Sequence, residues 1–579
     1  MRITKKLKKA KGITLIALVI TVIVLLMLSG ITISMLTGDN GIITKVKEAK
    51  EKTKQAEQEE TYALESVLNS INSSAPSTDG YNEGKEVNSP KITQGMIPVK
   101  WNGTNWQVCS QDDNEWYSYK DKKWANIMLS DGTYKSDTVQ VGQVVTDNEL
   151  GSMYVWIPRY AYTVDNTSKK MNVTFVKGNT NEGVNGETFT TDESVDTKTT
   201  KLVHPGFNLE GTALTGIWVA KFEASGTDKN GNAVGNASST SGAEQYHPDE
   251  TTIAKSLPNK ISWRHITIGE SEKRSMDIAT TDKDKFGLNY TSSHLIKNSE
   301  WGTVAYLSYS EYGSVPQING VGSLVSNSHW YDMYTGQGPK SNGNESWYNY
   351  DAAHNYNTET GVLASTTGDT TGVYDMNGGA WERVAAYLDN GNGNLNNYGK
   401  SADGKIKYFE NGKLNGAYSS LWDKYEVSEE EKNNKIKIDG ETTIITQGDI
   451  SNWDKGSEIY QAARFKLATA NYNNMAKHKG IGVNEVNVEG FSFYAPGKAT
   501  SNNSKPWLYY KTLEQAVAGT DNYYGRAWNS DSVLIGYSAW PFVLRGGFCN
   551  DWDEAGVFVS DITNGYGFYN SGFRSVLVL

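Results

Sequence analysis

The first pattern along the chain is a long apolar run behind a cluster of positive charges. Residues 13–36 contain no charged side chain, whereas residues 1–12 carry only Lys and Arg charges. At about 1.5 Å per residue, a helix of this length crosses a bilayer core of about 30 Å. Because positive flanks stay in the cytoplasm, we expect one transmembrane helix, Ile13–Leu36, with the C-terminal part extracellular. A cleaved secretory signal is the alternative, but the run is long for one and no A-x-A-like site follows.

Residues 11–30, KGITLIALVITVIVLLMLSG, resemble the leader of type IV prepilins. The resemblance implies that a prepilin peptidase cleaves after Gly12 and leaves Ile13 as the new N-terminus. The family usually has Glu at the fifth mature position, and this chain has Ala17 there. The anchor could therefore serve a pilus, as a minor or tip subunit, or simple retention in the cell membrane.

Beyond the apolar run, composition divides the chain into further segments. Residues 37–72 are rich in Lys, Glu, Gln and Ala, which predicts an extension of the pilin-like helix. Residues 73–92 are rich in Ser, Gly and Asn, which predicts a flexible linker.

Residues 93–149 are expected to form a small β-rich spacer. Asn102-Gly103, flanked by alternating apolar residues, predicts a hairpin. Aromatic side chains then alternate with polar ones at Trp116, Tyr117, Tyr119 and Trp124. They form either the packed face of a small sheet, which we favour, or a surface on which carbohydrates stack.

From residue 150 to 579, short apolar runs alternate with loops rich in Gly, Asn and Ser. Tyr154–Pro158 and Ile217–Glu223 have the pattern of strands, and Asn298 or Ser299 can cap one of the few helices. The fold class is therefore α+β: a long N-terminal helix, then a domain of short strands, few helices and many loops. Residues 390–452, with the tract NGNGNLNN, are expected to be an exposed insertion.

Several motifs of this domain resemble the formylglycine-generating-enzyme, or sulfatase-modifying, family. They occur in the family's order: the strand 217–223, HLIKNSEW at 294–301, GVYDMNGGAWE at 372–382, RGG at 545–547 and GFR at 572–574. The resemblance implies a C-type lectin fold for residues 150–579.

The same resemblance does not carry the family's chemistry. Its oxidases hold copper with two cysteines after RGG, whereas this chain has Cys549 and then Glu554. One thiolate cannot form a two-coordinate copper site. The iron-dependent branch needs clustered His ligands, and the seven His of this chain have no close metal spacing. We expect a protein that is not an enzyme and has no certain cofactor.

Calcium is the one metal that the resemblance suggests. The family's Ca²⁺ turn would correspond to the carbonyl groups of Asn377, Gly378 and Ala380 and the carboxylate of Glu382, and such oxygen ligands suit Ca²⁺. The chain departs from the family at Gly379, where Asn is usual. The alternative is that Glu382 caps a turn or pairs with an Arg.

The C-terminal segment, residues 545–579, is similar to the variable region of ligand-binding proteins that are diversified by retroelements. Those proteins use a C-type lectin fold and often end in GFRxVL. The resemblance implies that the residues between the fixed landmarks face a ligand, and aromatic and acidic side chains suit such a contact surface. The expected ligand-binding residues are Phe548, Asn550, Asp551, Trp552, Asp553, Glu554, Val559, Asp561, Tyr566, Phe568, Tyr569 and Asn570.

Net charge narrows the class of partner. The chain has a formal charge of −11, and its first 75 residues are net basic, so the remainder is strongly acidic. An acidic ectodomain repels nucleic acid, which we exclude as a partner. We therefore expect a surface adhesin for a protein or glycan on another cell or a phage. The alternatives are a structural minor pilin or pseudopilin and a residual sulfatase-modifying-type oxidase.

Overall fold

The computed structural model describes most of the chain beyond residue 75. The described residues are 76–230, 233–234, 252–314, 333–338, 350–427, 435–438, 441–444, 466, 469–483, 485–486, 493–496, 507–510, 528, 531, 533, 540–548 and 555–579. All of these residues belong to one compact unit, residues 70–579. The predicted leader, the transmembrane helix, its extension and the processing site at Gly12 and Ile13 lie outside the described residues.

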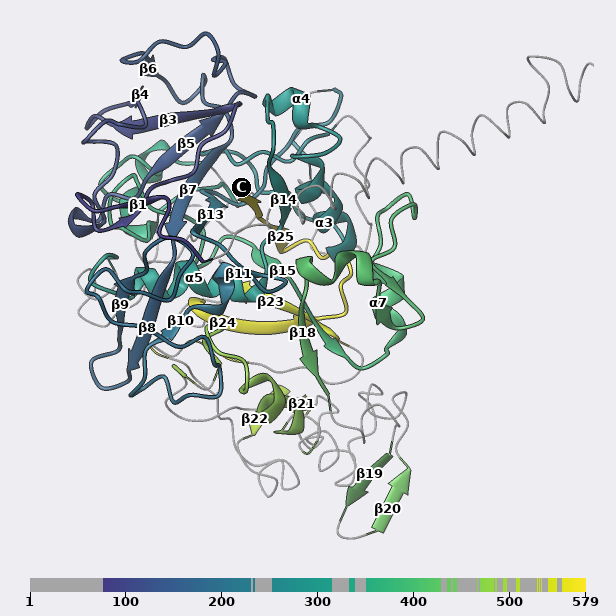
Figure 1. Cartoon of the computed structure of the whole chain (residues 1–579). Coiled ribbons are helices and arrows are strands. Elements are labelled where there is room, and N and C mark those ends of the chain that lie inside the picture. Colours follow the sequence, from purple (N-terminus) through teal and green to yellow (C-terminus); the bar gives the residue numbers. More distant parts are fainter. Residues whose placement is uncertain are drawn as a thin grey trace, which may run out of the picture. The chain divides into compact units, whose positions relative to one another are not determined.

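The largest sheet has eight strands, and all its neighbouring strands are antiparallel. Figure 1 shows it on the side where the purple and blue strands lie. The spatial order is β14 (Ser292–Leu295), β26 (Ser575–Val578), β13 (Gly216–Ala220), β7 (Met153–Pro158), β5 (Asn126–Leu129), β3 (Met96–Trp101), β4 (Trp106–Val108) and β6 (Val144–Val145).

The hairpin between β3 and β4 forms as its sequence predicts. Val99 pairs with Val108 and Trp101 with Trp106. In the turn, Asn102 Oδ1 accepts hydrogen bonds from the backbone N–H groups of Thr104 and Asn105, at 3.0 and 2.9 Å. An Asx turn of this kind fixes the register of the two strands.

The predicted separation between a spacer, 93–149, and the following domain is wrong. β5 pairs directly with β7, so both segments belong to the eight-stranded sheet. Trp116, Tyr117, Tyr119 and Trp124 are all buried, which confirms the packed-face interpretation. The sequence could not distinguish a separate spacer from a segment of the large sheet, because strand pairing between distant segments leaves no local pattern.

The described part of the predicted linker, residues 76–92, is also packed against the domain. It contains a short hairpin, β1 (Tyr81–Asn82) and β2 (Val87–Asn88). The buried Asn88 side chain donates to the carbonyl groups of Gly178 and Thr215 and accepts from the N–H of Gly178. These bonds hold residues that were expected to be flexible.

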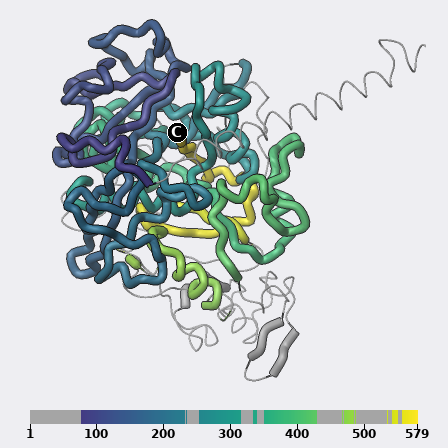
Figure 2. The backbone as a smooth tube through the Cα atoms, viewed as in Figure 1, coloured from purple at the N-terminus to yellow at the C-terminus, as the bar shows by residue number. Residues whose placement is uncertain are grey.

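The second sheet contains the C-terminal motifs. Its order is β18 (Asp423–Glu426), β15 (Trp381–Asp389), β23 (Phe542–Gly546) and β24 (Gly556–Thr563), and β25 (Ser571–Phe573) pairs in parallel with the start of β15. β24 lies at the edge of this sheet, and the yellow tube in Figure 2 follows these last strands through the body of the molecule.

The expected exposed insertion, 390–452, is only in part exposed: many of its described residues reach solvent, but others belong to the core, and for these the prediction is wrong. β18 pairs in parallel with β15. Leu395, Tyr408, Phe409 and Trp422 are buried in the same apolar cluster as Phe542. The Gly- and Asn-rich tract suggested exposure, but the aromatic residues that follow it supply the packing.

Smaller sheets and a few helices complete the described residues. A three-stranded sheet has the order β10 (Leu202–Val203), β8 (Tyr160–Asp165), β9 (Lys170–Phe175). The hairpins are β11 (Asn208–Leu209) with β12 (Thr212–Ala213), β16 (Phe409–Glu410) with β17 (Lys413–Leu414), β19 (Lys435–Ile438) with β20 (Glu441–Ile444), and β21 (Phe493–Pro496) with β22 (Trp507–Tyr510). The helices are α3 (Ile268–Asp277), α4 (Lys283–Phe286), α5 (Asn298–Ser308), α7 (Gly393–Tyr398) and the 3₁₀ turns η1 (Tyr119–Asp121), η2 (Pro205–Phe207), η3 (Ala352–His354), η4 (Gly361–Ala364) and η5 (Gly416–Leu421). Residues 469–475 are also helical.

Helix α5 confirms the helix predicted after Asn298, with its N-cap one residue earlier. The Glu300 carboxylate accepts from the backbone N–H of Lys297 at 2.9 Å, which satisfies a donor at the helix start. Among the helices of the described residues, none has the length and apolar character needed to cross a membrane. The described part of the chain is thus a mixed structure in which strands outnumber helices.

Candidate functional site

The C-terminal segment presents a short aromatic turn, residues 564–570, between β24 and β25. Phe568 is 41% exposed, an unusual value for a large apolar side chain of this protein, and Tyr566 and Tyr569 are half-buried. The rings of Tyr566 and Phe568 meet edge to face with their centroids 5.6 Å apart. Three of the predicted ligand-binding aromatic residues are therefore brought together at the surface.

The backbone of the aromatic turn is held by the scaffold beneath it. Residues far away in sequence donate hydrogen bonds to five of its carbonyl groups. The donors and acceptors are Ile268 N–H to Gly565, Arg383 Nη2 to Tyr566, His265 N–H to Phe568, Arg264 Nη1 to Tyr569 and Trp381 N–H to Asn570. The backbone is thus fixed while side chains such as Phe568 reach solvent, and a fixed backbone lowers the entropy lost on binding.

Two buried arginines are the part of this arrangement that the sequence reasoning missed. Arg264 and Arg383 are almost fully buried, and Arg383 Nε also donates to the carbonyl of Ile266 at 3.0 Å. Burial lowers the pKa of Arg383 to about 9, so the group stays charged at neutral pH. The sequence did contain a signal. Arg383 is the single Arg in the largely apolar run of β15, and a charged side chain is rarely buried in such a run unless it has partners.

Other predicted ligand-binding residues are placed differently. Phe548 is 4% exposed and packs against Met333 and Ala380, and Val559 is 1% exposed, so their prediction as surface contacts is wrong. Both are apolar residues whose strand-like surroundings left the direction of the side chain undetermined. Asp561 is half-buried on β24, and Asn570 is half-buried in the aromatic turn. Asn550, Asp551, Trp552, Asp553 and Glu554 lie outside the described residues, as does Cys549.

Glu382, the carboxylate of the expected calcium turn, forms an ion pair with Arg574. Both side chains are fully buried. Arg574 Nε donates to Glu382 Oε2 at 2.6 Å, and Arg574 Nη2 donates to Oε1. Burial raises the pKa of Glu382 to about 7, although the Arg574 charge opposes that rise. The structure thus has the alternative arrangement, in which Glu382 pairs with an Arg.

The remaining residues of that turn are buried too. Asn377 and Ala380 are 5% and 0% exposed, and the Gly378 N–H donates to the carbonyl of Gly546 at 3.1 Å. The Ala380 N–H donates to Glu223, whose pKa is raised well above its usual range by burial and by the nearby Asp375 and Glu382 carboxyl groups. Within the described residues, no group of three or more His, Cys, Asp or Glu side chains is placed to hold a metal ion.

We expect added Ca²⁺ to leave the melting temperature of the protein unchanged. A calcium ion bound by Glu382 would lie beside the Arg574 guanidinium, and the two positive charges would repel each other. Isothermal titration with Ca²⁺ and thermal unfolding with and without EDTA measure this. A binding heat together with a rise in melting temperature would restore the calcium prediction.

One cysteine can be placed. Cys109 is buried, and burial raises the pKa of its thiol to about 12. It is a small buried apolar side chain, as the sequence suggested, and it is unreactive at neutral pH.

Comparison with known proteins adds no relationship to these observations: no protein-family model matches the chain, and no curated protein sequence matches it.

Proposed function

We propose that this protein is displayed on the cell surface and recognises a protein or glycan through its C-terminal segment, with the aromatic turn 564–570 as the centre of the contact. The observation that supports the proposal is the exposed Phe568 on a backbone held by five scaffold hydrogen bonds. Aromatic residues on a rigid support are the usual anchors of binding surfaces. The C-type lectin fold and diversification by a retroelement belong to the same proposal.

The proposed location follows from the sequence of the N-terminus. Residues 13–36 anchor the chain in the cell membrane after a prepilin peptidase has cut behind Gly12, and the C-terminal domain faces outward. Cleavage is tested by N-terminal sequencing of the protein from membranes, where Ile13 is the expected first residue. A first residue at Met1 or beyond residue 36 would contradict it.

Replacing Phe568 with alanine is expected to weaken ligand binding at least tenfold, which corresponds to about 1.4 kcal/mol. The ring is 41% exposed, so its loss should leave the melting temperature unchanged. Binding of the purified full-length chain to glycan and cell-surface protein arrays identifies the ligand, and titration of that ligand measures the effect.

Tyr290→Ala is the matched control for this experiment. Tyr290 is 93% exposed and precedes β14, so the substitution removes a more exposed ring outside the aromatic turn. The control should bind like the unchanged protein. Equal loss in both variants, or undiminished binding by Phe568→Ala, would contradict the proposed contact, and a folded protein that binds nothing on either array would contradict the adhesin function.

Diversification is tested at the gene rather than on the protein. A template repeat and a reverse transcriptase gene beside the coding sequence are expected. Their absence would remove this part of the proposal and leave the binding surface unaffected.

A further inference from the structure

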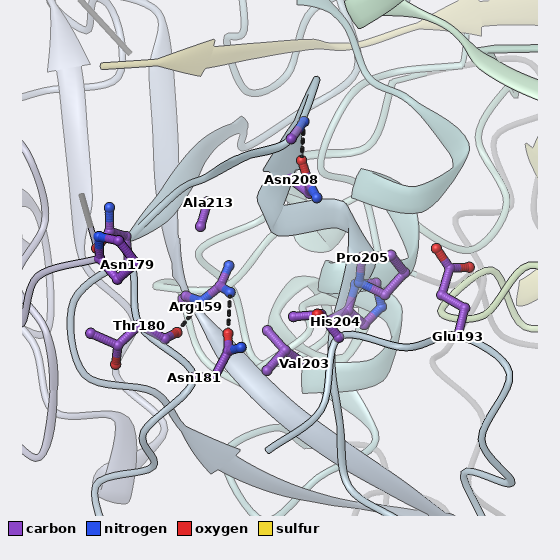
Figure 3. Close-up of a pocket in the computed structure, with 13 residues that line it drawn as sticks. Arg159, Asn179, Thr180, Asn181, Glu193, Val203, His204, Pro205, Asn208 and Ala213 are labelled. Atoms are coloured by element: carbon purple, nitrogen blue, oxygen red, sulfur yellow. Dashed lines mark hydrogen bonds between the residues drawn. The ribbon is translucent and has the colours of Figure 1, made fainter. Parts of the chain in front are cut away.

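A second site of interest is a cavity of about 290 Å³, with a mixed polar and apolar lining, between the three-stranded sheet and the hairpin β11–β12. Figure 3 shows Arg159 in its middle, with Asn179 toward one end and Glu193 at the other. Its lining includes Arg159, Asn179, Asn181, Glu193, His204 and Asn208. The volume lies just below the usual range for drug-sized ligand sites, which suits one sugar ring or one amino acid.

Arg159 brings a buried positive charge to this cavity. The side chain is 2% exposed and donates to the carbonyl groups of Thr180 and Phe207 and to Asn181 Oδ1, at 3.0, 3.1 and 3.2 Å. These three bonds use three of the five guanidinium N–H groups. No carboxylate among the described residues forms an ion pair with it. Burial lowers the pKa of Arg159 to about 10, which leaves it charged at neutral pH.

Three asparagine side chains around Arg159 are oriented by hydrogen bonds to their oxygen atoms. Asn179 Oδ1 accepts from Ser77 N–H at 2.6 Å, Asn181 Oδ1 accepts from Arg159, and Asn208 Oδ1 accepts from Gly211 N–H at 2.7 Å. Because each partner is a donor, the side-chain atom that it contacts must be the amide oxygen. The Nδ2 group of each asparagine is therefore not engaged by that partner. Within the described part of the chain, these Nδ2 groups donate no hydrogen bond.

The other polar groups at or near the cavity are of mixed kind. His204 adds no donor to it, because Nδ1 accepts from Gly206 N–H at 3.2 Å and the buried Nε2 lies toward the Gly480 backbone. Lys297, outside the lining, donates its Nζ to the Asn208 carbonyl at 3.4 Å and adds a positive charge nearby. The Glu193 carboxylate accepts from Lys479 N–H at 2.9 Å, at the end away from Asn179.

We propose that this cavity binds a carboxylate-bearing ligand of the size of a single sugar or amino acid, with the carboxylate facing Arg159 and the amide groups of Asn181 and Asn208. A carboxylate accepts several hydrogen bonds and compensates the buried guanidinium charge, which a neutral ligand cannot do. Glu193 can accept a hydroxyl or ammonium group at the other end of such a ligand. The site is distinct from the aromatic turn and does not depend on the function proposed above.

The test compares carboxylates with neutral molecules of the same shape. The full-length protein is titrated with D-glucuronate and D-glucose, and with L-glutamate and L-glutamine, by calorimetry or ligand-observed NMR. At least one carboxylate is expected to bind tenfold more tightly than its neutral partner, and the two pairs distinguish an acidic sugar from an amino acid. Equal affinity within both pairs, or no carboxylate bound with a Kd below about 10 mM, would overturn the proposal.

Asn208→Asp is the variant that isolates the ligand contact. An aspartate keeps the oxygen that accepts from Gly211 N–H, but it replaces the Nδ2 donor with a negative charge that repels a carboxylate. Asn208 is exposed, so the melting temperature should stay the same while carboxylate affinity falls at least tenfold. Asn102→Asp is the control, because it makes the same change in the exposed β3–β4 turn. Equal effects of the two variants would also overturn the proposal.

Discussion

Replacement of Arg574 with methionine is expected to lower the free energy of unfolding by about 3–5 kcal/mol, because it leaves the buried Glu382 carboxylate without its partner. Arg574 also donates to the carbonyl groups of Ala220 and Tyr374, at 3.1 and 3.0 Å. Ala220 ends β13 of the eight-stranded sheet, whereas Glu382 belongs to β15 of the second sheet. The substitution therefore removes a link between the two sheets as well as a charge pair.

The pH dependence of this loss identifies its cause. A carboxyl group whose pKa is higher in the folded state binds protons preferentially there, so stability falls as pH rises through the interval between the unfolded and folded values. For Glu382 that interval runs from 4.5 to about 7 in the unchanged protein. Without Arg574 the pKa of Glu382 rises further, and stability keeps falling above pH 7. The difference between Arg574→Met and the unchanged protein should grow from pH 6 to pH 8 in denaturant unfolding.

A surface ion pair provides the control. Lys120 and Glu86 are paired, but their side chains are 74% and 55% exposed. Lys120→Met should not change the unfolding midpoint measurably, because solvent screens an exposed pair. If Arg574→Met unfolds at the same denaturant concentration as the unchanged protein at pH 8, the ion pair does not hold the two sheets together.

Trp422→Ala is expected to destabilise the protein by about 3–5 kcal/mol. Trp422 lies in the segment that its sequence marks as an exposed insertion, yet it is 4% exposed. Its ring centroid is 5.1 Å from that of Phe409 and 6.0 Å from that of Phe542. Removal of the indole would leave a cavity that these rigid neighbours cannot fill.

The companion variant for Trp422→Ala is Lys413→Ala, at an exposed position of the β16–β17 hairpin in the same segment. Thermal and denaturant unfolding of both variants should show a large loss for the tryptophan and almost none for the lysine. A neutral Trp422→Ala would mean that the segment is the exposed addition that its composition suggests.

Elements with a local cause could be predicted. The β3–β4 hairpin depends on the turn at Asn102-Gly103, β7 on the run Tyr154–Pro158, and α5 on the capping residues around Asn298 and Glu300. The C-terminal landmarks Arg545, Phe573 and Arg574 are buried, as expected for scaffold residues. For the hairpin, the strand and the helix, the determining residues lie within a few positions of one another. The landmarks were identified through the family resemblance, because Arg574 contacts residues that are distant in sequence.

Features with a distant cause could not be predicted. The spacer joins the main sheet because Ile127 pairs with Tyr154, and the insertion is buried because Trp422 meets Phe542. The sequence of the spacer does not indicate its pairing with Tyr154, and the sequence of the insertion does not indicate its contact with Phe542. For the proposed binding surface, the sequence identified the aromatic residues of the turn, but the exposure of Phe568 depends on donors at residues 264–268 and 381–383. The same limit explains why Phe548 was placed on the surface.

The position of β26 has a consequence for biosynthesis. It lies between β13 and β14, so Trp218 pairs with Leu577 and His294 with Val576. The largest sheet therefore lacks the strand that joins its edge strand β14 to β13 until residues 575–578 have left the ribosome, and contacts this distant in sequence form slowly. A nascent chain that stalls or is cut before this strand exposes two unpaired strand edges, which chaperones and proteases recognise. Only molecules that contain this strand would then complete the sheet and escape removal.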